Sequence, residues 1–534
     1  MSNHSNQRVE WPAQKTIVIM EQSFIVSPGE ILKGFNRREA SPLKKQAGRI
    51  YTLAGNRPPK GLQPDSKRKT RRVSVVIPVL NESRRIAQVV KFALRSRLVK
   101  EVLVIDDGSI DGTPELARAA GARVVTSFML GKGGSMEDGV TYARSDTILY
   151  LDGDLDGLCE DLVERMCRPL LAGEADFVKA RFSRKAGRVT VLTARPLLRT
   201  YFPEIAHFEQ PLGGILCARA DLLRQLRFEN DYGVDIGLLL DAVGLGARIA
   251  EVDIGHIEHE SQDLDRLGEM ATQVARAILD RAAMYGRLKQ SFVRQAREKE
   301  SLLRADPEFV VSRVGAVDRL ALFDMDGTLF DGRFIVELAK RTGREEKLAK
   351  YLDRRDLTPE SRTRSIARIF AGVPVEVFTK TAMAMPLASG AVEAVVGLRK
   401  RGYRVGIVTD SYQVAAEIAR RRVFADFALS NVVEFRKGRA TGIVTLAPTM
   451  RSGTVGRRAY DKLNALRFLT RRMGISARQV LAVGDGENDI GMLRAAGISV
   501  AFQPKTERLS RVAQHVINDR LDRVLDLLTP VVGI

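Results

Sequence analysis

Two pairs of aspartates, each separated by one residue, follow apolar runs in this sequence. Asp152 and Asp154 end the run in "ILYLDGDLDG", and Asp324 and Asp326 end the run in "LALFDMDGTL". Two carboxylates that project from the end of a strand can hold Mg²⁺ or Mn²⁺ and leave positions open for phosphate oxygens. A carboxylate beside such a metal can also attack phosphorus as a nucleophile. The pattern therefore indicates phosphate chemistry at two places, with two different roles for the aspartates.

Further polar residues precede the first pair at predicted strand ends, in "VIPVLNE", "VIDDGS" and "GKGG". Together these segments could contact a base, a ribose and phosphates, with Lys132 as a point charge on a diphosphate. A metal at the aspartates would offset the charge that develops on a nucleoside diphosphate leaving group. An isolated D-x-D more often caps a turn or a helix, so the surrounding pattern is what favours a nucleotide site.

The elements that would position the first pair alternate between strand and helix. From residue 73, "VSVVIPVL", "VKEVLVIDDGS", "ARVVTS" and "DTILYLDGD" have the apolar runs of buried strands, and "ESRRIAQVVKFALRS" and "TPELARAAG" have helical spacing. This alternation predicts a mostly parallel sheet that is covered on both faces. Ligands bind beyond the carboxyl ends of the strands in such sheets. The polar residues predicted at that edge are Asn81, Glu82, Asp106, Asp107, Asp152 and Asp154.

A second α/β domain is predicted around the second pair. Helical spacing dominates from Leu264 to about Arg304, and a new strand begins near residue 319 with "RLALFDMDG". A helical stretch follows, and then "YRVGIVTDS", "VLAVGDGEND" and "GISVAF" each precede sequence with helical spacing. The fold class is therefore α/β for both domains.

Composition and charge narrow the class of protein. A chain of 534 residues with 45% apolar residues is too long for one core and should form two or three domains. No apolar run is long enough for a membrane span, and the N-terminus lacks the apolar core of a signal peptide. Three cysteines are too few for a disulfide framework. We therefore predict a reducing, cytoplasmic location without a membrane span.

The positive charge is concentrated at the N-terminus. The net charge is +20, and residues 1–72 contribute 15 basic and 5 acidic residues, which is +10. A segment of this kind could bind nucleic acid or a membrane surface. No aromatic or Gly-rich nucleic-acid motif accompanies the charge, so we expect a solvated extension and no nucleic-acid partner.

The segments around the first pair resemble a known enzyme family. "VSVVIPVLNES", "EVLVIDDGSIDGT", "GKGG" and "YLDGDL" resemble nucleotide-sugar glycosyltransferases of the GT-A fold. "AGRVTVLTARPLLRTYFPEIAHFEQPLGGILCARADLL", "YGVDIGLLLDAVG" and "VDIGHIEHESQDLDRLGEM" resemble the glucosyl-3-phosphoglycerate synthases. The resemblance covers about residues 73–285. It implies transfer of a sugar from a nucleoside diphosphate to a phosphorylated three-carbon acceptor, with Mg²⁺ or Mn²⁺.

This resemblance implies roles at individual positions. The nucleotide-sugar positions are Pro78, Val79, Leu80, Asn81, Glu82, Asp107, Lys132, Asp152 and Gly153. The acceptor positions are Gly187, Arg188, Val189, Thr190, Tyr232, Gly233, Val234 and Asp235. The metal ligands are Asp154 and His259, and only the family pattern selects His259 over the nearby His256. "AGRVT" also offers N–H groups, a guanidinium and a hydroxyl for a phosphate.

Two positions depart from the family pattern. "HESQ", His259 to Gln262, stands where the family usually has a basic stretch with Asn after the metal histidine, and Asp235 stands where the family has the longer Glu. Both departures leave a different sugar or acceptor open.

The second pair resembles the first motif of the haloacid-dehalogenase (HAD) phosphatases. This resemblance implies that Asp324 takes the phosphoryl group and that Asp326 acts as its acid and base. Thr409 in "GIVTDS" would bind the phosphoryl oxygen, and Lys462 in "AYDKLNAL" would offset charge. The Mg²⁺ ligands would be Asp324, Asp326, Asp485 and Asp489, the last two from "VGDGENDIGML". "LASGAVEAVVGLRKRGYRVGIVTDS" further resembles the phosphoserine-phosphatase branch, and about residues 330–385 would form a helical cap.

The two resemblances predict one bifunctional chain. Residues 1–70 would be a basic extension and linker, 71–304 a GT-A domain, and 315–534 a HAD domain. The first domain would make glucosyl-3-phosphoglycerate, and the second would remove the phosphate to leave glucosylglycerate, a compatible-solute type of product. The alternatives are a GDP-mannose enzyme that makes mannosylglycerate, a phosphatase fused to a non-catalytic nucleotide-sugar-binding domain, and enzymes tethered by the basic segment to a membrane or nucleic acid. A homodimer is possible.

Overall fold

The structure is a computed structural model. It describes residues 49–528 except 52–71, 184–186, 258–263, 291–292, 294–305, 313, 316, 353, 355 and 452–459. Residues 1–48 and 52–70 of the predicted basic extension, and the predicted metal ligand His259, lie outside the described residues.

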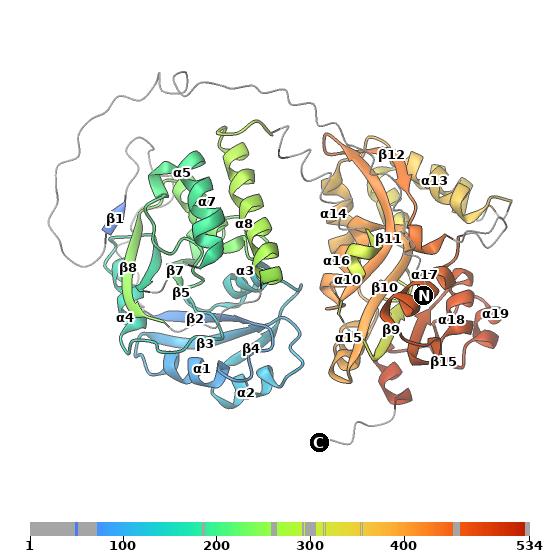
Figure 1. Cartoon of the computed structure of the whole chain (residues 1–534), viewed down its shortest axis with the longest axis horizontal. Helices are drawn as coiled ribbons and strands as arrows, with labels where there is room; N and C mark the ends of the chain where they lie inside the picture. Colours follow the sequence, from blue (N-terminus) through green and yellow to red (C-terminus); the bar gives the residue numbers. More distant parts are fainter. Residues whose placement is uncertain are drawn as a thin grey trace, which may run out of the picture. The chain divides into compact units, whose positions relative to one another are not determined.

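The first domain contains an eight-stranded mixed sheet with the order β1-β8-β6-β7-β5-β2-β3-β4 (Figure 1). Its strands are β1 (Arg49–Tyr51), β2 (Val73–Val79), β3 (Val99–Asp106), β4 (Arg123–Thr126), β5 (Thr147–Tyr150), β6 (Phe177–Ser183), β7 (Leu216–Arg219) and β8 (Ile249–His256). β2 pairs in parallel with β3 and β5, and β3 with β4. β7 runs antiparallel to both of its neighbours, β5 and β6. The carboxyl ends of the parallel strands therefore share one edge, where the first aspartate pair follows β5.

Alternate residues of these strands point to opposite faces, and each face has its own core. Val76 and Ile148 belong to one apolar cluster, whereas Val75 and Leu149 belong to the other. The helices are α1 (Ile86–Leu94), α2 (Thr113–Ala119), α3 (Lys132–Tyr142), α4 (Leu162–Leu171), α5 (Arg195–Tyr201), α6 (Ala220–Leu223), α7 (Val234–Gly244) and α8 (Leu264–Met284). α1 packs on β3, α3 on β2 and β3, and α4 on β6, β7 and β8, while α7 and α8 pack on each other.

The second domain contains a seven-stranded sheet with the order β12-β11-β10-β9-β13-β14-β15. Its strands are β9 (Arg319–Phe323), β10 (Tyr403–Tyr412), β11 (Phe427–Arg436), β12 (Arg439–Thr445), β13 (Val480–Gly484), β14 (Ile498–Phe502) and β15 (His515–Ile517). All neighbours are parallel except β11 and β12, which form an antiparallel pair. Central β9 lies between β10 and β13, so the ends of these three strands adjoin. The α/β class predicted for both domains is confirmed.

Four helices fill the chain between β9 and the helix that precedes β10. The helices of this domain are α10 (Pro307–Ser312), α11 (Phe334–Thr342), α12 (Glu345–Leu352), α13 (Pro359–Ile369), α14 (Val375–Ala384), α15 (Ala391–Lys400), α16 (Gln413–Arg422), α17 (Lys462–Met473), α18 (Ile490–Ala495) and α19 (Glu507–Val512). The rings of Phe334, Phe378 and Tyr412 pack within 6.5 Å of one another, which joins α11 and α14 to the end of β10. α11 to α14 occupy the range predicted for a helical cap.

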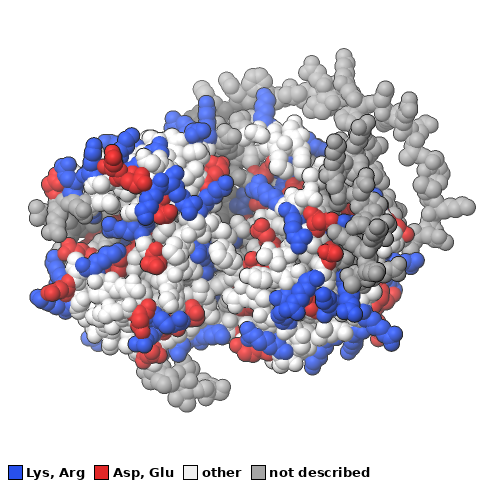
Figure 2. Space-filling view, turned by 180° about the vertical axis from the view of Figure 1, so that it is seen from behind, with Lys and Arg blue, Asp and Glu red and all other residues white. Residues whose placement is uncertain are grey.

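The surface of the described residues carries both signs of charge. Figure 2 shows basic and acidic side chains interspersed over the face in view. Within the described part of the chain, no helix is long and apolar enough to cross a membrane.

Candidate active sites

The end of β2 is tied to the loop after β3 by the residues predicted to bind a nucleotide. Asn81 has a left-handed φ of 59°, its N–H donates to Ser109 Oγ at 2.9 Å, and its side-chain oxygen accepts from Ile110 N at 2.9 Å. The N–H of Glu82 donates to Thr113 Oγ1 at 2.8 Å. The Asn side chain tolerates this backbone conformation better than a branched residue would. These contacts fix the position of Glu82 at the sheet edge.

Glu82 lies in a locally acidic environment. Burial raises its pKa to about 7, and the negative charges of Asp154 and Asp152 add to the effect. Mutual repulsion of carboxylates is relieved when a cation binds between them. The three carboxylates therefore concentrate negative charge at this edge, where the sequence predicts the metal ligand Asp154.

Asp107 anchors the segment that contains Lys132. Its carboxylate accepts from Gly131 N at 3.0 Å and from Ser135 Oγ at 2.5 Å. Its exposed fraction is 4%, and burial raises its pKa to about 6. Asp107 thus supports the N-terminal end of α3, which begins at Lys132.

Lys132 joins the predicted nucleotide-sugar residues to the predicted acceptor residues. Its Nζ lies 2.9 Å from Asp152 Oδ1 and 3.0 Å from Asp235 Oδ2. Burial alone would lower the pKa of Lys132, but the two carboxylates outweigh burial and raise it. Oδ1 of Asp235 is buried and has no hydrogen-bond partner among the described residues. The lysine therefore stays charged, and Asp235 keeps one oxygen for a ligand.

Close packing surrounds Asp152. A Cβ atom on Gly214 would lie 2.3 Å from Asp152 Oδ1, and a Cβ on Gly153 would lie 2.8 Å from Val79 Cγ1. Nearby, the fully buried Lys179 on β6 donates to Gly213 O at 2.5 Å. Burial lowers the pKa of Lys179 to about 8. Only glycine fits at 153 and 214 without displacing these groups.

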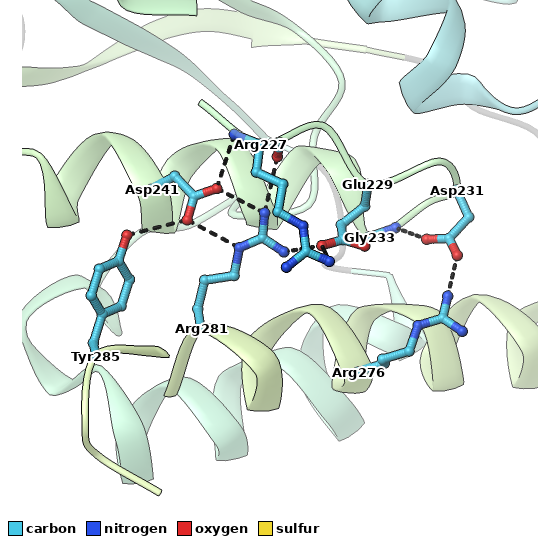
Figure 3. A network of polar contacts seen from close by, with 8 residues as sticks. All are labelled: Arg227, Glu229, Asp231, Gly233, Asp241, Arg276, Arg281 and Tyr285. Carbon is cyan, nitrogen blue, oxygen red and sulfur yellow. Dashed lines mark hydrogen bonds and ion pairs between the residues drawn. The ribbon is translucent and has the colours of Figure 1, made fainter. Parts of the chain in front are cut away.

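An ionic network holds the segment before α7, which contains the predicted acceptor residues Tyr232 and Gly233 (Figure 3). Arg281 of α8 is fully buried and pairs with Asp241 at 2.7 Å and with Glu229. Arg276 of α8 pairs with Asp231, whose other oxygen accepts from Gly233 N at 3.0 Å.

The backbone of this segment is also fixed from α8. Tyr232 N donates to Gln273 Oε1 at 3.1 Å, and Tyr285, which directly follows α8, donates its OH to Asp241 Oδ1 of α7 at 3.2 Å. Helix α8 thus holds the segment 229–233, which leads into Asp235 in the first turn of α7.

The other predicted acceptor residues start a helix. Gly187 accepts from Val191 N at 3.1 Å, and a π-helical turn spans Thr190–Ala194 before α5. Arg188 is exposed, while Val189 and Thr190 are buried. The side chain of Arg188 is therefore the accessible polar group of this segment. The acceptor roles of these residues stay predictions.

The predicted phosphatase residues converge at the adjoining ends of β9, β10 and β13. Lys462, at the start of α17, has its Nζ 2.5 Å from Asp324 Oδ1 and 2.7 Å from Asp489 Oδ1. Asp489 is fully buried, and its other oxygen accepts from the N–H groups of Asp485 and Gly486 at 3.1 and 3.0 Å. Both carboxylate oxygens of Asp489 are thus held by protein contacts, which makes this residue a firm support for Lys462.

Burial and neighbouring charge act in opposite directions at Asp324. Burial raises its pKa, and Lys462 opposes that effect. For Lys462, burial alone would lower the pKa, but Asp324 and Asp489 raise it. The short Lys462 contact favours the ionised carboxylate that a nucleophile requires.

Asp326 and Thr409 flank this centre. Asp326 Oδ1 accepts from Phe334 N at 2.8 Å, and burial raises its pKa to about 6. A carboxyl group with this pKa can both give and take a proton near neutral pH. Thr409 is fully buried, and its Oγ1 accepts from Ser411 N at 3.1 Å.

A candidate metal centre lies in the same place. Asp324, Asp485 and Asp489 each offer a carboxylate oxygen, and these oxygens lie within 4.8 Å of one another. Asp485 is also paired with Lys505, which the sequence did not indicate. Three buried carboxylates against two cations fit a further positive charge such as Mg²⁺.

Comparisons with known proteins assign both domains. Residues 74–226 match the sequence model described as glycosyl transferase family 2. Over 242 residues the chain is 36% identical to the glucosyl-3-phosphoglycerate synthase of Mycolicibacterium paratuberculosis, which covers 40% of this chain and 73% of the relative. The chain belongs to the glucosyl-3-phosphoglycerate synthase family. The relative from Mycobacterium tuberculosis is 37% identical with 74% of its length covered.

This family member carries a second domain of another kind. Residues 321–494 match the model described as haloacid dehalogenase-like hydrolase. The phosphoserine phosphatase of Archaeoglobus fulgidus is 33% identical over 205 residues, which is 38% of this chain and 56% of that protein. The synthase-family chain therefore contains a glycosyltransferase domain followed by a HAD domain that is similar to phosphoserine phosphatases.

A solved structure of a relative is also similar in sequence to part of this chain. Glucosyl-3-phosphoglycerate synthase from Mycobacterium tuberculosis was solved with Mn²⁺, UDP-glucose and phosphoglyceric acid. It is 38% identical, covers 40% of this chain and 80% of its own, and has a TM-score of 0.38.

Proposed function

We propose that this chain is a bifunctional enzyme. Its first domain transfers glucose from a nucleoside diphosphate glucose to 3-phosphoglycerate, and its second domain hydrolyses the resulting phosphate ester to glucosylglycerate. The observation that supports it most is the occurrence, in one synthase-family chain, of the Lys132 bridge and of the Asp324–Lys462 centre. The product of the first reaction is a phosphate monoester, which is the substrate class of the second.

In the transfer reaction, the residues at the sheet edge bind and orient the two substrates. Asp154 and His259 would hold Mg²⁺ or Mn²⁺, which supplies positive charge for the diphosphate. Lys132 would move from its carboxylate partners toward the diphosphate oxygens and stabilise the leaving group. Asp235, with its unpaired oxygen, would accept a hydrogen bond from a substrate hydroxyl.

In the hydrolysis, two bonds to phosphorus form and break in turn. Asp324 attacks phosphorus, and the ester oxygen leaves with a proton from Asp326. Water then attacks the phosphorus of the aspartyl phosphate and gives a proton to Asp326. The bond between phosphorus and the Asp324 oxygen breaks, which releases inorganic phosphate and restores the Asp324 carboxylate. Thr409 and Lys462 would contact the phosphoryl oxygens throughout. Asp324 and Asp485 would hold Mg²⁺, which supplies charge neutralisation between the carboxylate and the phosphate.

The test is the variant Asp324→Asn. The amide keeps the size of the side chain but lacks the anionic oxygen that attacks phosphorus. With UDP- or GDP-glucose, 3-phosphoglycerate and Mg²⁺ or Mn²⁺, wild type should release nucleoside diphosphate and inorganic phosphate together. The variant should release nucleoside diphosphate and accumulate a product that is heavier by one phosphate in mass spectrometry. Dephosphorylated product at the normal rate would rule out Asp324 as the nucleophile.

The reciprocal control is Asp154→Ala. It should abolish transfer and leave hydrolysis of added glucosyl-3-phosphoglycerate unchanged. If a folded Asp154→Ala protein loses both activities, the two sites do not work separately.

Nucleoside diphosphate release that is independent of 3-phosphoglycerate would overturn the assignment of the acceptor, and faster turnover with GDP-mannose would favour the mannosyl alternative. A chain that hydrolyses the ester without any transfer would be a phosphatase with a binding domain.

A further inference from the structure

The loop after the nucleophile places an arginine beside the phosphatase centre. Gly327 N donates to Phe330 O at 3.0 Å and to Gly332 O at 2.9 Å, which closes the loop on itself. The next residue but one, Phe334, donates its N–H to Asp326 Oδ1 at 2.8 Å. Arg333 lies between these fixed points, directly before α11, and its side chain is exposed. The backbone therefore holds Arg333 one residue away from a hydrogen bond to Asp326.

Arg333 differs from the other cations at this centre. Lys462 is paired with Asp324 and Asp489, and Lys505 is paired with Asp485. Within the part of the chain that the structure describes, Arg333 forms no ion pair. Its backbone position, one residue before the N–H that donates to Asp326 Oδ1 at 2.8 Å, places it at the edge of this centre. An exposed guanidinium beside a phosphate site is available for a second anionic group on the substrate.

We propose that Arg333 binds a carboxylate of the phosphatase substrate and so selects phosphate monoesters that carry one. A glycerate ester has its carboxylate two bonds from the phosphate-bearing carbon, so one small ligand can reach both the nucleophile and a neighbouring cation. Planar guanidinium and planar carboxylate form two parallel hydrogen bonds, which favours this pair over a contact with a neutral hydroxyl. The inference rests on the hydrolytic half of the proposed function.

The experiment uses substrate pairs that differ only in the carboxylate. One pair is glucosyl-3-phosphoglycerate and 2-O-glucosylglycerol 3-phosphate, and the smaller pair is 3-phosphoglycerate and glycerol 3-phosphate. Wild type should favour the carboxylate member in kcat/KM by roughly 10- to 100-fold, which corresponds to one charge-assisted contact. Arg333→Gln should remove this preference by raising KM for the member with a carboxylate. The kcat for that member, and both kcat and KM for the member without a carboxylate, should stay nearly unchanged. Arg333→Lys should keep part of the preference.

The matched control is Arg341→Gln on the same helix. Arg341 is exposed and pairs with Glu337 at 3.5 Å, and it lies more than two helical turns from Arg333. This control should leave both the preference and the rates unchanged.

Three outcomes would overturn the inference. The first is a wild-type enzyme without preference for the carboxylate. The second is an Arg333→Gln variant that loses activity equally on both members, because Arg333 would then serve the phosphate or the fold. The third is an Arg333→Gln variant with a shifted pH profile of kcat on the esters without a carboxylate, because Arg333 would then act by setting the pKa of Asp326.

A different result would show that the proposed function itself is wrong. Hydrolysis of the small esters or of phosphoserine, with none of the glucosylated ester, would reject glucosylglycerate as the product. The carboxylate preference on the small pair would still decide the role of Arg333.

Discussion

The Lys132 bridge offers the sharpest test of the transferase site. Lys132→Met keeps the length of the side chain and removes the charge that lies 2.9 Å from Asp152 and 3.0 Å from Asp235. The exposed fractions of the three side chains are 20%, 23% and 4%, so Asp235 is the carboxylate that cannot regain its partner from water. Breaking a buried pair costs about 3–5 kcal/mol, and the partial exposure of two members places the expected loss near the lower end.

The same substitution should slow transfer for a separate reason. Loss of one preorganised cation or donor at a developing charge typically lowers kcat by about 10²–10³. Nucleoside diphosphate release should therefore fall by that factor, while hydrolysis of an added phosphate monoester stays at the wild-type rate. Hydrogen exchange resolved by peptide would report the stability of the first domain by itself, because a chain of two domains is not expected to unfold in one step.

A second substitution separates the two effects. Asp235→Asn, added to Lys132→Met, removes the carboxylate that lost its partner and should restore most of the lost protection from exchange. It should restore none of the transfer rate, because the lysine charge is still missing. If Lys132→Met alone keeps both the protection and the rate of wild type, the bridge does not exist in solution. If the double variant is no more protected than the single one, the loss of stability has another cause.

Three further predictions concern the surroundings of the two sites. Gly214→Ala should abolish transfer, because the new Cβ would lie 2.3 Å from the carboxylate of Asp152. The control is Gly268→Ala on α8, where a Cβ has no neighbouring atom within 4 Å; in a calorimetric scan it should leave stability unchanged or raise it by about 1 kcal/mol. Asp107→Asn should flatten the pH dependence of unfolding. The raised pKa of about 6 means that the folded state holds this proton more tightly, so wild-type stability falls by about 3 kcal/mol as pH rises from about 4 to about 6, and urea titrations of both proteins would measure the difference. Mg²⁺ should protect the second domain from hydrogen exchange, EDTA should remove that protection together with the phosphatase activity, and Asp485→Asn should lose both effects.

The central strands of both sheets were predictable because buried parallel strands have continuous apolar sequences. "VSVVIPVL" became β2, and "RLALF" became β9, within a residue or two of the expected ends. The sequence did not indicate α3 or β7. "KGGSMEDGVTY" contains three glycines and little apolar periodicity, and its helix is held instead by Asp107 and by packing on β2 and β3. β7 has only four residues and runs antiparallel to both of its neighbours, β5 and β6.

The residues of the candidate sites likewise include some that the sequence predicts and some that it does not. Residues within a contiguous motif, such as Asp324 and Asp326, were predictable because their spacing carries the chemistry. Lys179, Lys505 and Gly214 were not, since their importance comes from contacts between distant segments. No spacing rule connects Gly214 to Asp152, although the two lie too close together for any side chain between them.

The two aspartate pairs differ in their surroundings, and that difference accounts for their proposed roles. After β5, Asp152 keeps a side-chain exposure of 23% and shares its counterion, the 20% exposed Lys132, with Asp235. A lysine that two carboxylates hold at partial exposure can turn to a diphosphate when one binds. After β9, Asp324 is 5% exposed and meets Lys462, which is itself only 2% exposed and is fixed by the fully buried Asp489. A carboxylate held in this way has one direction of attack and little water around it, as covalent catalysis at phosphorus requires. The same D-x-D spacing at a strand end therefore favours ligand binding at the first site and nucleophilic chemistry at the second, because burial and the fixation of the neighbouring lysine differ.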